Sequence, residues 1–206
     1  YCSGQVSGSV VDDHSYLRAP AGSFTTDDSL TVSDNSIMSI QGPLTQDISP
    51  SDDNVKVNVL ASSQLSVAAA SMTTSRVNVG GASQLQVHSN LTAGRDIFIG
   101  TNSNVSVATG HVVSGVHAAD AMLTVSTQSR LSVPYGSIMC AKDLLATDLS
   151  SVSAFGPVAQ LGEVICSTGV CTLGRAHGTI FPGKVAVVSG SELVVTDRAL
   201  SAVRVE

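Results

Sequence analysis

The chain of 206 residues contains no tryptophan, and aromatic residues make up only 3% of it. Charged residues are also few, at 13%, and only three of them are lysines. Binding the phosphates of nucleic acids needs clustered cations, so this composition argues against a nucleic-acid partner. No apolar run approaches the roughly 18 residues that a membrane helix requires, so we expect no membrane insertion.

The sequence also lacks a recognisable catalytic set, because its five histidines share no position in the repeat described below. β-Helical enzymes that act on polysaccharides need acidic and basic groups on one face, with aromatic platforms for the sugar rings. This chain offers four Phe and three Tyr in total. We therefore expect no enzymatic activity and no cofactor.

Candidate metal ligands also lack the spacing of a known metal site. His111, His117 and Asp120 lie in one short stretch, but their spacing matches no known zinc signature. Paired aspartates without the spacing of a calcium loop occur at 12–13, 27–28 and 52–53. The sequence thus predicts no metal site. Residues 1–60 carry eight acids against Arg18 and Lys56, which leaves a divalent cation or a basic partner open at that end.

Hydrophobic residues are plentiful, at 43%, and they follow a period of twenty. The segments Ser63–Val67, Ser83–Val87 and Ser103–Val107 echo one another, and an apolar triplet starts eight residues before the central apolar residue of each. A fixed period of this length is typical of a solenoid, in which each repeat forms one coil. We expect the first triplets to begin at Leu30, Val57, Val77, Ile97, Leu123, Leu144 or Leu145, Ile165 and Val185, and the second at Met38, Leu65, Leu85, Val105, Leu131, Val152, Leu173 and Leu193.

A third apolar position follows each second triplet, which indicates three faces per coil. It is expected at Met72, Leu91, Val112, Ile138, Ala159, Ile180 and Leu200. Since strand side chains alternate, the outer residues of each triplet should point inward and the middle one outward. The sequence therefore predicts an all-β, single-domain, right-handed parallel β-solenoid (β-helix) of about eight triangular coils.

The repeat divides the chain into two parts. Residues 1–28 lie outside the clear register and are expected to form an N-terminal arm or cap, with a donated strand as one alternative. Residues 29–206 form the solenoid, with loop insertions near 43–53 and 109–122, where the steps exceed twenty. Insertions in solenoids emerge as loops on one face, which are frequent binding positions.

A serine precedes the second triplet in most repeats and forms the most regular polar feature. The column comprises Ser36, Ser63, Ser83, Ser103, Ser129 and Ser191. We interpret it as a corner ladder in which each hydroxyl bonds a backbone group at a turn.

Four cysteines and two sequons suggest covalent modification in an oxidising compartment. Cys166 and Cys171 flank a glycine-containing corner and are a candidate disulfide. Cys2 and Cys140 are far apart along the expected rod and are candidates for an intermolecular or arm-tethering bond. Asn90 and Asn104 head the sequons and are candidate glycosylation sites.

Both ends of the rod are candidate assembly surfaces. Val203-Arg204-Val205 repeats the triplet at Val185, so we expect a further coil to begin there and to present an open edge. The run at Val6, Val10 and Val11 is strand-like and is the candidate partner for such an edge. A head-to-tail contact that does not close produces a filament.

The segment Thr92-Ala-Gly-Arg-Asp-Ile-Phe-Ile99, together with repeats such as Ser83–Val87, resembles the repeats of filamentous haemagglutinin-type adhesins. The similarity covers roughly residues 55–135. It implies a parallel β-helix and an extracellular or cell-surface location.

These observations favour a secreted or surface structural protein that assembles with itself, head to tail, into an extracellular filament. The alternative is an adhesin or carbohydrate-binding module that uses the two insertion loops to bind glycans.

Overall fold

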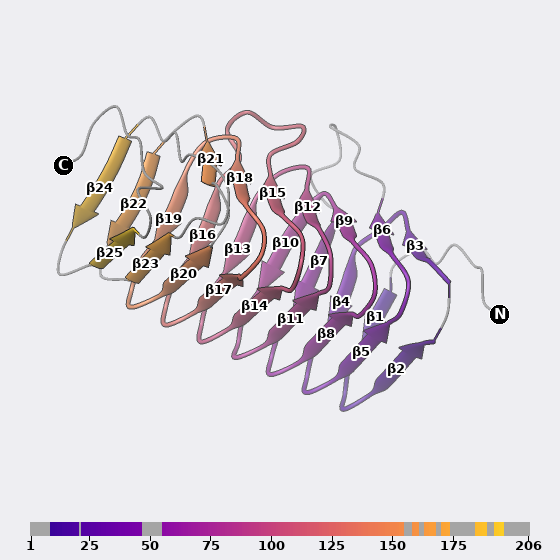
Figure 1. The fold of residues 1–206 in the computed structure, drawn as a ribbon. Coiled ribbons are helices and arrows are strands. Elements are labelled where there is room, and N and C mark those ends of the chain that lie inside the picture. The colour runs from indigo at the N-terminus through magenta and orange to yellow at the C-terminus, as the bar shows by residue number, and fades with distance from the viewer. Residues whose placement is uncertain are drawn as a thin grey trace.

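The computed structural model describes residues 9–20, 22–46 and 55–154 in full, and beyond them the strand backbones of 158–160, 163–167, 170–173, 184–188 and 192–195. All regular structure in these ranges is β-strand, arranged in three parallel sheets that wrap around one rod (Figure 1). From β1 to β23, successive strands along the chain belong to successive sheets, so three strands complete one coil. The prediction of an all-β parallel solenoid with three faces is confirmed.

Nine strands form the first sheet and nine form the second, while seven described strands form the third. The first sheet comprises β1 (Ser9–Val11), β4 (Leu30–Val32), β7 (Lys56–Val59), β10 (Arg76–Val79), β13 (Ile97–Ile99), β16 (Leu123–Val125), β19 (Leu144–Ala146), β22 (Glu163–Ser167) and β24 (Lys184–Val188). The second comprises β2 (Tyr16–Ala19), β5 (Ile37–Ile40), β8 (Gln64–Val67), β11 (Gln84–Val87), β14 (Asn104–Val107), β17 (Arg130–Val133), β20 (Ser151–Ala154), β23 (Val170–Leu173) and β25 (Glu192–Val195). The third comprises β3 (Phe24–Thr26), β6 (Leu44–Gln46), β9 (Met72–Thr74), β12 (Leu91–Ala93), β15 (Val112–Ser114), β18 (Ile138–Cys140) and β21 (Val158–Gln160).

Three corners join the sheets. We call the turn from the first sheet to the second the first corner, the turn from the second to the third the second corner, and the passage from the third sheet to the next coil the third corner. Both predicted insertions are at the third corner. One lies between β15 and β16, and the other lies between β6 and β7, largely outside the described residues.

Aliphatic side chains stack in register along the interior. Val77 pairs with Val57 on one side and with Ile97 on the other, and Leu85 likewise lies between Leu65 and Val105. These side chains are almost completely buried. Burying one such side chain stabilises the fold by about 1.5–3 kcal/mol, so the columns supply the main driving force for stacking. The predicted register is confirmed over residues 30–152.

Residues 9–26 lie where the cap alternative places the N-terminal segment, on the chain's own next coil, and they are in register with that coil although the sequence showed no clear register there. Ser9 pairs with Leu30, Tyr16 with Ile37 and Phe24 with Leu44, so β1, β2 and β3 form a coil stacked on the chain's own next coil. This extra coil raises the number from the expected eight to nine. The aliphatic repeat is not visible in this coil, because Ser9 and Phe24 occupy positions that Leu30 and Leu44 occupy in the next coil.

The register beyond residue 154 corrects three expectations. Val158, not Ala159, pairs with Ile138. Val164, not Ile165, pairs with Val185, since this step is twenty-one residues. Cys171, not Leu173, pairs with Leu193. Continuous apolar runs such as Val164-Ile165-Cys166 do not show which residue points inward, and a slip of one position exchanges the two faces. Ile180, Ser191 and Leu200 lie outside the described residues.

Candidate functional site

The N-terminal end of the described stack exposes part of its interior. Leu17 occupies the inward position of β2, in register with Met38 and then Leu65. Leu17 is 39% exposed, whereas Met38 is 0% and Leu65 is 1% exposed. Phe24, in the third sheet of the same coil, is only half-buried. Leu17 and part of Phe24 are therefore accessible at this end, whereas Val11, the inward apolar residue of β1, is buried with 6% exposed.

Strand edges lie around these accessible side chains. Among the described strands, β1 pairs only with β4, β2 only with β5, and β3 only with β6. The opposite edge of each strand carries backbone N–H and C=O groups that can pair with a further strand. Val10 and Val11 lie in β1 and pair with Thr31 and Val32 of the same chain, so they already serve their own solenoid. Val6, Val203 and Val205 lie outside the described residues.

The predicted serine ladder is present at the first corner. The backbone N–H of one coil donates to the serine Oγ of the following coil, so the ladder has a direction. The N···Oγ distances are 3.0 Å from Ser15 to Ser36, 3.1 Å from Ser36 to Ser63, 3.1 Å from Ser63 to Ser83, 3.2 Å from Ser83 to Ser103 and 3.1 Å from Ser103 to Ser129. The five accepting serines are buried. The interpretation of this column as a backbone-binding ladder is confirmed for Ser36 through Ser129.

A second ladder, at the second corner, was not predicted. Here each backbone N–H donates to the side chain of the preceding coil. The N–H of Asn90 reaches Ser71 Oγ at 3.3 Å, that of His111 reaches Asn90 Oδ1 at 2.9 Å, and that of Ser137 reaches His111 Nδ1 at 3.1 Å. Ser137 Oγ also lies 2.6 Å from His111 Nδ1. Because the N–H of Ser137 donates to Nδ1, that nitrogen is the unprotonated acceptor of the ring. The accepting position of this ladder is occupied by three different residue types, so no repeated residue identifies it in the sequence.

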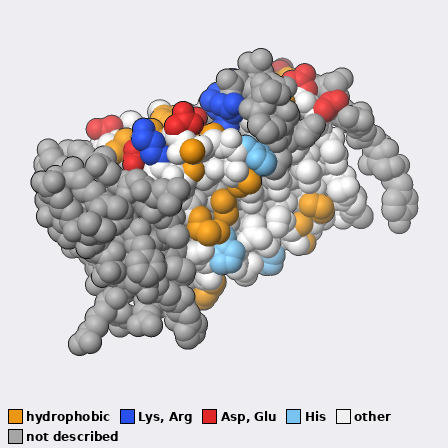
Figure 2. Space-filling model, turned by 90° about the horizontal axis from the view of Figure 1, so that it is seen from above, with side chains coloured by type: hydrophobic (Ala, Val, Ile, Leu, Met, Phe, Trp, Pro, Cys, Tyr) orange, Lys and Arg blue, Asp and Glu red, His pale blue; other side chains and the backbone are white. Residues whose placement is uncertain are grey.

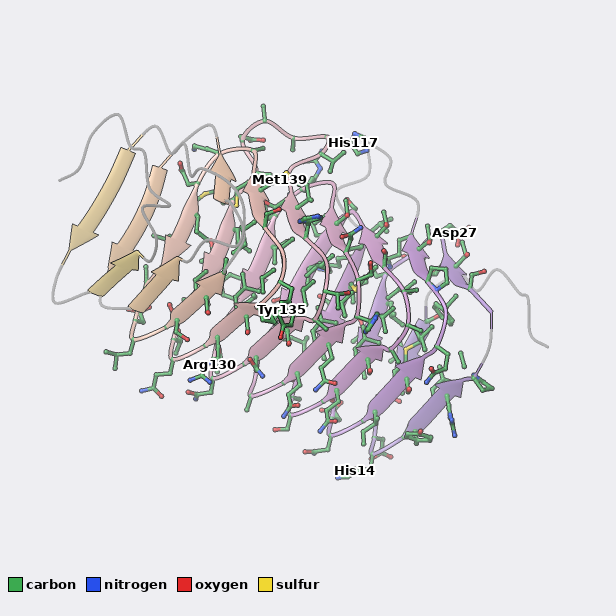
Figure 3. All side chains as sticks on the ribbon, in the orientation of Figure 1. His14, Asp27, His117, Arg130, Tyr135 and Met139 are labelled. Carbon is green, nitrogen blue, oxygen red and sulfur yellow. The ribbon has the colours of Figure 1, made fainter. Side chains whose placement is uncertain are left out.

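The candidate metal ligands are not brought together. His111 lies at the second corner, whereas His117 and Asp120 lie in the third-corner loop, where Figure 3 shows His117. Within the part of the chain that the structure describes, no group of three His, Cys, Asp or Glu side chains is placed to hold a metal.

Charged side chains gather along the third corner instead (Figure 2). Asp96 joins its own coil to both neighbouring coils there, since its Oδ1 accepts the N–H of Met122 at 3.0 Å and its Oδ2 lies 3.5 Å from Arg76 Nε. Asp96 thereby fixes the end of the insertion loop, which is a structural role.

Cys140 is inaccessible in the folded chain. It points inward from β18 and is 5% exposed. Burial raises its pKa from 9.0 to about 12, with a smaller upward contribution from Asp143 and an opposing one from Ser114, so the thiol stays protonated. A bond from Cys140 to another chain therefore requires the wall to open.

The other candidate modification sites are located as follows. Cys2 lies outside the described residues. Cys166 and Cys171 lie in β22 and β23, on either side of a first corner, and their side chains are also outside the description. Asn104 is exposed on β14, while Asn90 is half-buried and its Oδ1 accepts the bond from His111. Their modification remains a prediction.

Comparison with known proteins yields no relative: no family model, no curated protein and no solved structure matches this chain. The resemblance to filamentous haemagglutinin-type repeats holds at the level of the parallel β-helix. Among the described residues, no helix is long and apolar enough to span a membrane.

Proposed function

We propose that this protein is a secreted or surface-exposed structural subunit that stacks head to tail with further copies of itself into an extracellular filament. The observation that carries this proposal is the exposure of Leu17, which is 39% exposed in an inward column whose next members are almost completely buried. A surface that continues the core of a domain is the kind of surface that a partner covers.

A second copy fits this end better than an unrelated protein, because all described coils stack on their neighbours by the same parallel strand pairing. Parallel pairing repeats in register from β1 to β24 in the first sheet and from β2 to β25 in the second. The last coil of one copy can therefore lie on the first coil of the next with the geometry used inside the chain. Such a contact is heterologous and leads to an open polymer.

The test is sedimentation and negative-stain electron microscopy of the intact chain over a series of concentrations. Nine coils at about 4.8 Å each give a unit roughly 40 Å long. We expect rods whose length grows with concentration while their width stays constant. Single units at every concentration would contradict the proposal.

A further inference from the structure

We propose that the outer face of the first sheet carries a saccharide-binding platform built on Phe98. The ligand is a neutral oligosaccharide, one ring of which stacks on the Phe98 side chain while its hydroxyl groups bond to Asn78 and Thr124. The site lies on the strands of the solenoid and not in the two insertion loops. It is additional to the contact between copies and does not depend on assembly.

Phe98 interrupts a polar column on the outside of the first sheet. The column runs in register through Thr31, Asn58, Asn78, Phe98 and Thr124. None of these residues is charged, and all except Phe98 carry a hydroxyl or an amide. Phe98 points outward from β13 and is 43% exposed. Its ring therefore takes no part in the interior columns and is accessible to a ligand.

Gly100 allows the Phe98 ring to lie against the sheet. A Cβ on Gly100 would lie 2.8 Å from both Cε1 and Cζ of the ring, closer than a Cβ normally approaches another atom. The ring thus rests on the backbone of Gly100, where any side chain would displace it. Because φ of Gly100 is not positive, its backbone conformation does not itself require glycine. The contact gives Phe98 a fixed position, and a fixed apolar surface costs a ligand little ordering of the protein.

Hydrogen-bonding groups flank the ring on both sides. Asn78 and Thr124 lie one strand spacing, about 4.8 Å, to either side of Phe98. Asn78 Nδ2 donates to Asn58 Oδ1 at 3.4 Å, and Asn58 Nδ2 donates to Thr31 Oγ1 at 3.2 Å. These bonds orient the amide of Asn78, whose Oδ1 accepts no hydrogen bond from the described residues. That oxygen can accept a hydrogen bond from a ligand hydroxyl.

This combination fits a neutral sugar better than a charged ligand or a protein. One face of a pyranose ring is lined with C–H groups that pack on the negative face of an aromatic ring, while its hydroxyls need polar partners at the edge. Arg76 and Asp96, two residues before Asn78 and Phe98, lie 3.5 Å apart (Nε to Oδ2), so the pair contributes no net charge. A stable protein partner would bury roughly 800 Å² on each side, far more than one ring offers.

The test is saturation-transfer difference NMR of the intact chain with two neutral probes, cellohexaose and chitohexaose, and with a hexamer of galacturonate as the charged counterpart. We expect at least one neutral probe to receive saturation, strongest at the C–H protons of one ring face, and the galacturonate hexamer to receive less. Binding of neither neutral probe at about 10 mM overturns the proposal. Stronger saturation of the galacturonate hexamer overturns it as well.

Variants of Phe98 locate the site. Phe98→Ala should lower the affinity at least about tenfold, as removal of an aromatic anchor does, whereas Phe98→Tyr keeps the ring and should bind like the parent. The matched control is Tyr135→Ala, because Tyr135 is 77% exposed at the second corner and should not contribute. No loss in Phe98→Ala, or an equal loss in Tyr135→Ala, would place the saccharide elsewhere and overturn the proposal.

A further variant leaves every aromatic residue in place. In Gly100→Ala the added methyl displaces the Phe98 ring from the sheet. We expect the affinity to fall at least about threefold, because the ring loses its fixed position. Parent-like affinity would contradict a platform that depends on Gly100. The Phe98 variants do not alter the core, so their result stands even if Gly100→Ala is destabilised. A chain that binds the probes but forms no filaments contradicts only the proposed function.

Discussion

At the first corner, successive coils use the same residue to accept a backbone hydrogen bond, whereas at the second corner they use different ones. The first series is Ser36, Ser63, Ser83, Ser103 and Ser129, and the second is Ser71, Asn90 and His111. The accepting serines of the first corner are buried, while His111 is exposed. A buried corner leaves room for one small hydroxyl, but an exposed corner accepts any side chain with a lone pair within reach. The accepting residue is therefore constant at the first corner because the buried space there is small.

The two corners also turn by different means. Each described first corner has two consecutive residues at positive φ, such as Asp34 and Asn35 or Thr101 and Asn102, and only Gly81 among these positions is a glycine. The second corner instead brings the backbones of adjacent coils close together. A Cβ on Gly136 would lie 1.6 Å from the carbonyl oxygen of Gly110. Glycine serves one corner by its conformation and the other by its small size.

The largest expected effect comes from filling this narrow space. We expect Gly136→Ala to lower the free energy of unfolding by about 3 kcal/mol, because rigid backbone, and not a flexible side chain, meets the added methyl. Urea unfolding followed by circular dichroism measures it. The control is Gly80→Ala at the first corner, where the nearest atom is Leu60 Cδ2 at an ordinary 3.5 Å and the loss should stay below about 1 kcal/mol. Equal losses would mean that the corners do not differ in this respect.

Removing one hydroxyl from the buried ladder should have the next largest effect. Ser83 Oγ accepts the N–H of Ser63 at 3.1 Å, and Ser83→Ala leaves that buried donor without its partner. We expect a loss of about 1–3 kcal/mol in the free energy of unfolding. Ser66→Ala, on the outward face of β8, should change it by less than about 0.5 kcal/mol. A similar small change at Ser83 would show that water enters the corner.

This contrast also explains how much could be predicted from the sequence. The interior columns and the serine ladder each repeat one residue class at a fixed spacing, so the positions of Val57, Leu65 and Ser63 in the coil could be predicted from the sequence. The second ladder depends on hydrogen-bonding capacity, which Ser71, Asn90 and His111 share although their letters differ. The first coil was missed for a related reason, since Ser9 and Phe24 pair with Leu30 and Leu44 but lack the aliphatic side chain that marks these two columns. The partial exposure of Leu17, on which the proposed contact with a second copy depends, is not visible in any sequence pattern.

At the second corner, the identity of the acceptor should matter less than its presence. His111→Leu removes the acceptor for the N–H of Ser137 and should cost about 1 kcal/mol of unfolding free energy. His111→Asn restores a side-chain acceptor like that of Asn90 in the preceding coil, so its cost should be less than half as large. Amide hydrogen exchange at Ser137 reports the bond directly, and exchange as fast in the Asn variant as in the Leu variant would contradict a ladder based on capacity.

The smallest expected effect is a gain, and it is confined to the first corner. Ala82 has a φ of 61° in the position that asparagine occupies at Asn35 and Asn102. Left-handed backbone costs most residues about 1–2 kcal/mol, and asparagine tolerates it better, so Ala82→Asn should raise the free energy of unfolding by up to about 1 kcal/mol. The reverse change, Asn102→Ala, should lower it by a similar amount. The control is Ala69→Asn at the second corner, where φ is not positive, and this change should bring no gain in the free energy of unfolding. A gain equal to that at Ala82 would mean that asparagine stabilises these turns by hydrogen bonding and not by its tolerance of left-handed backbone.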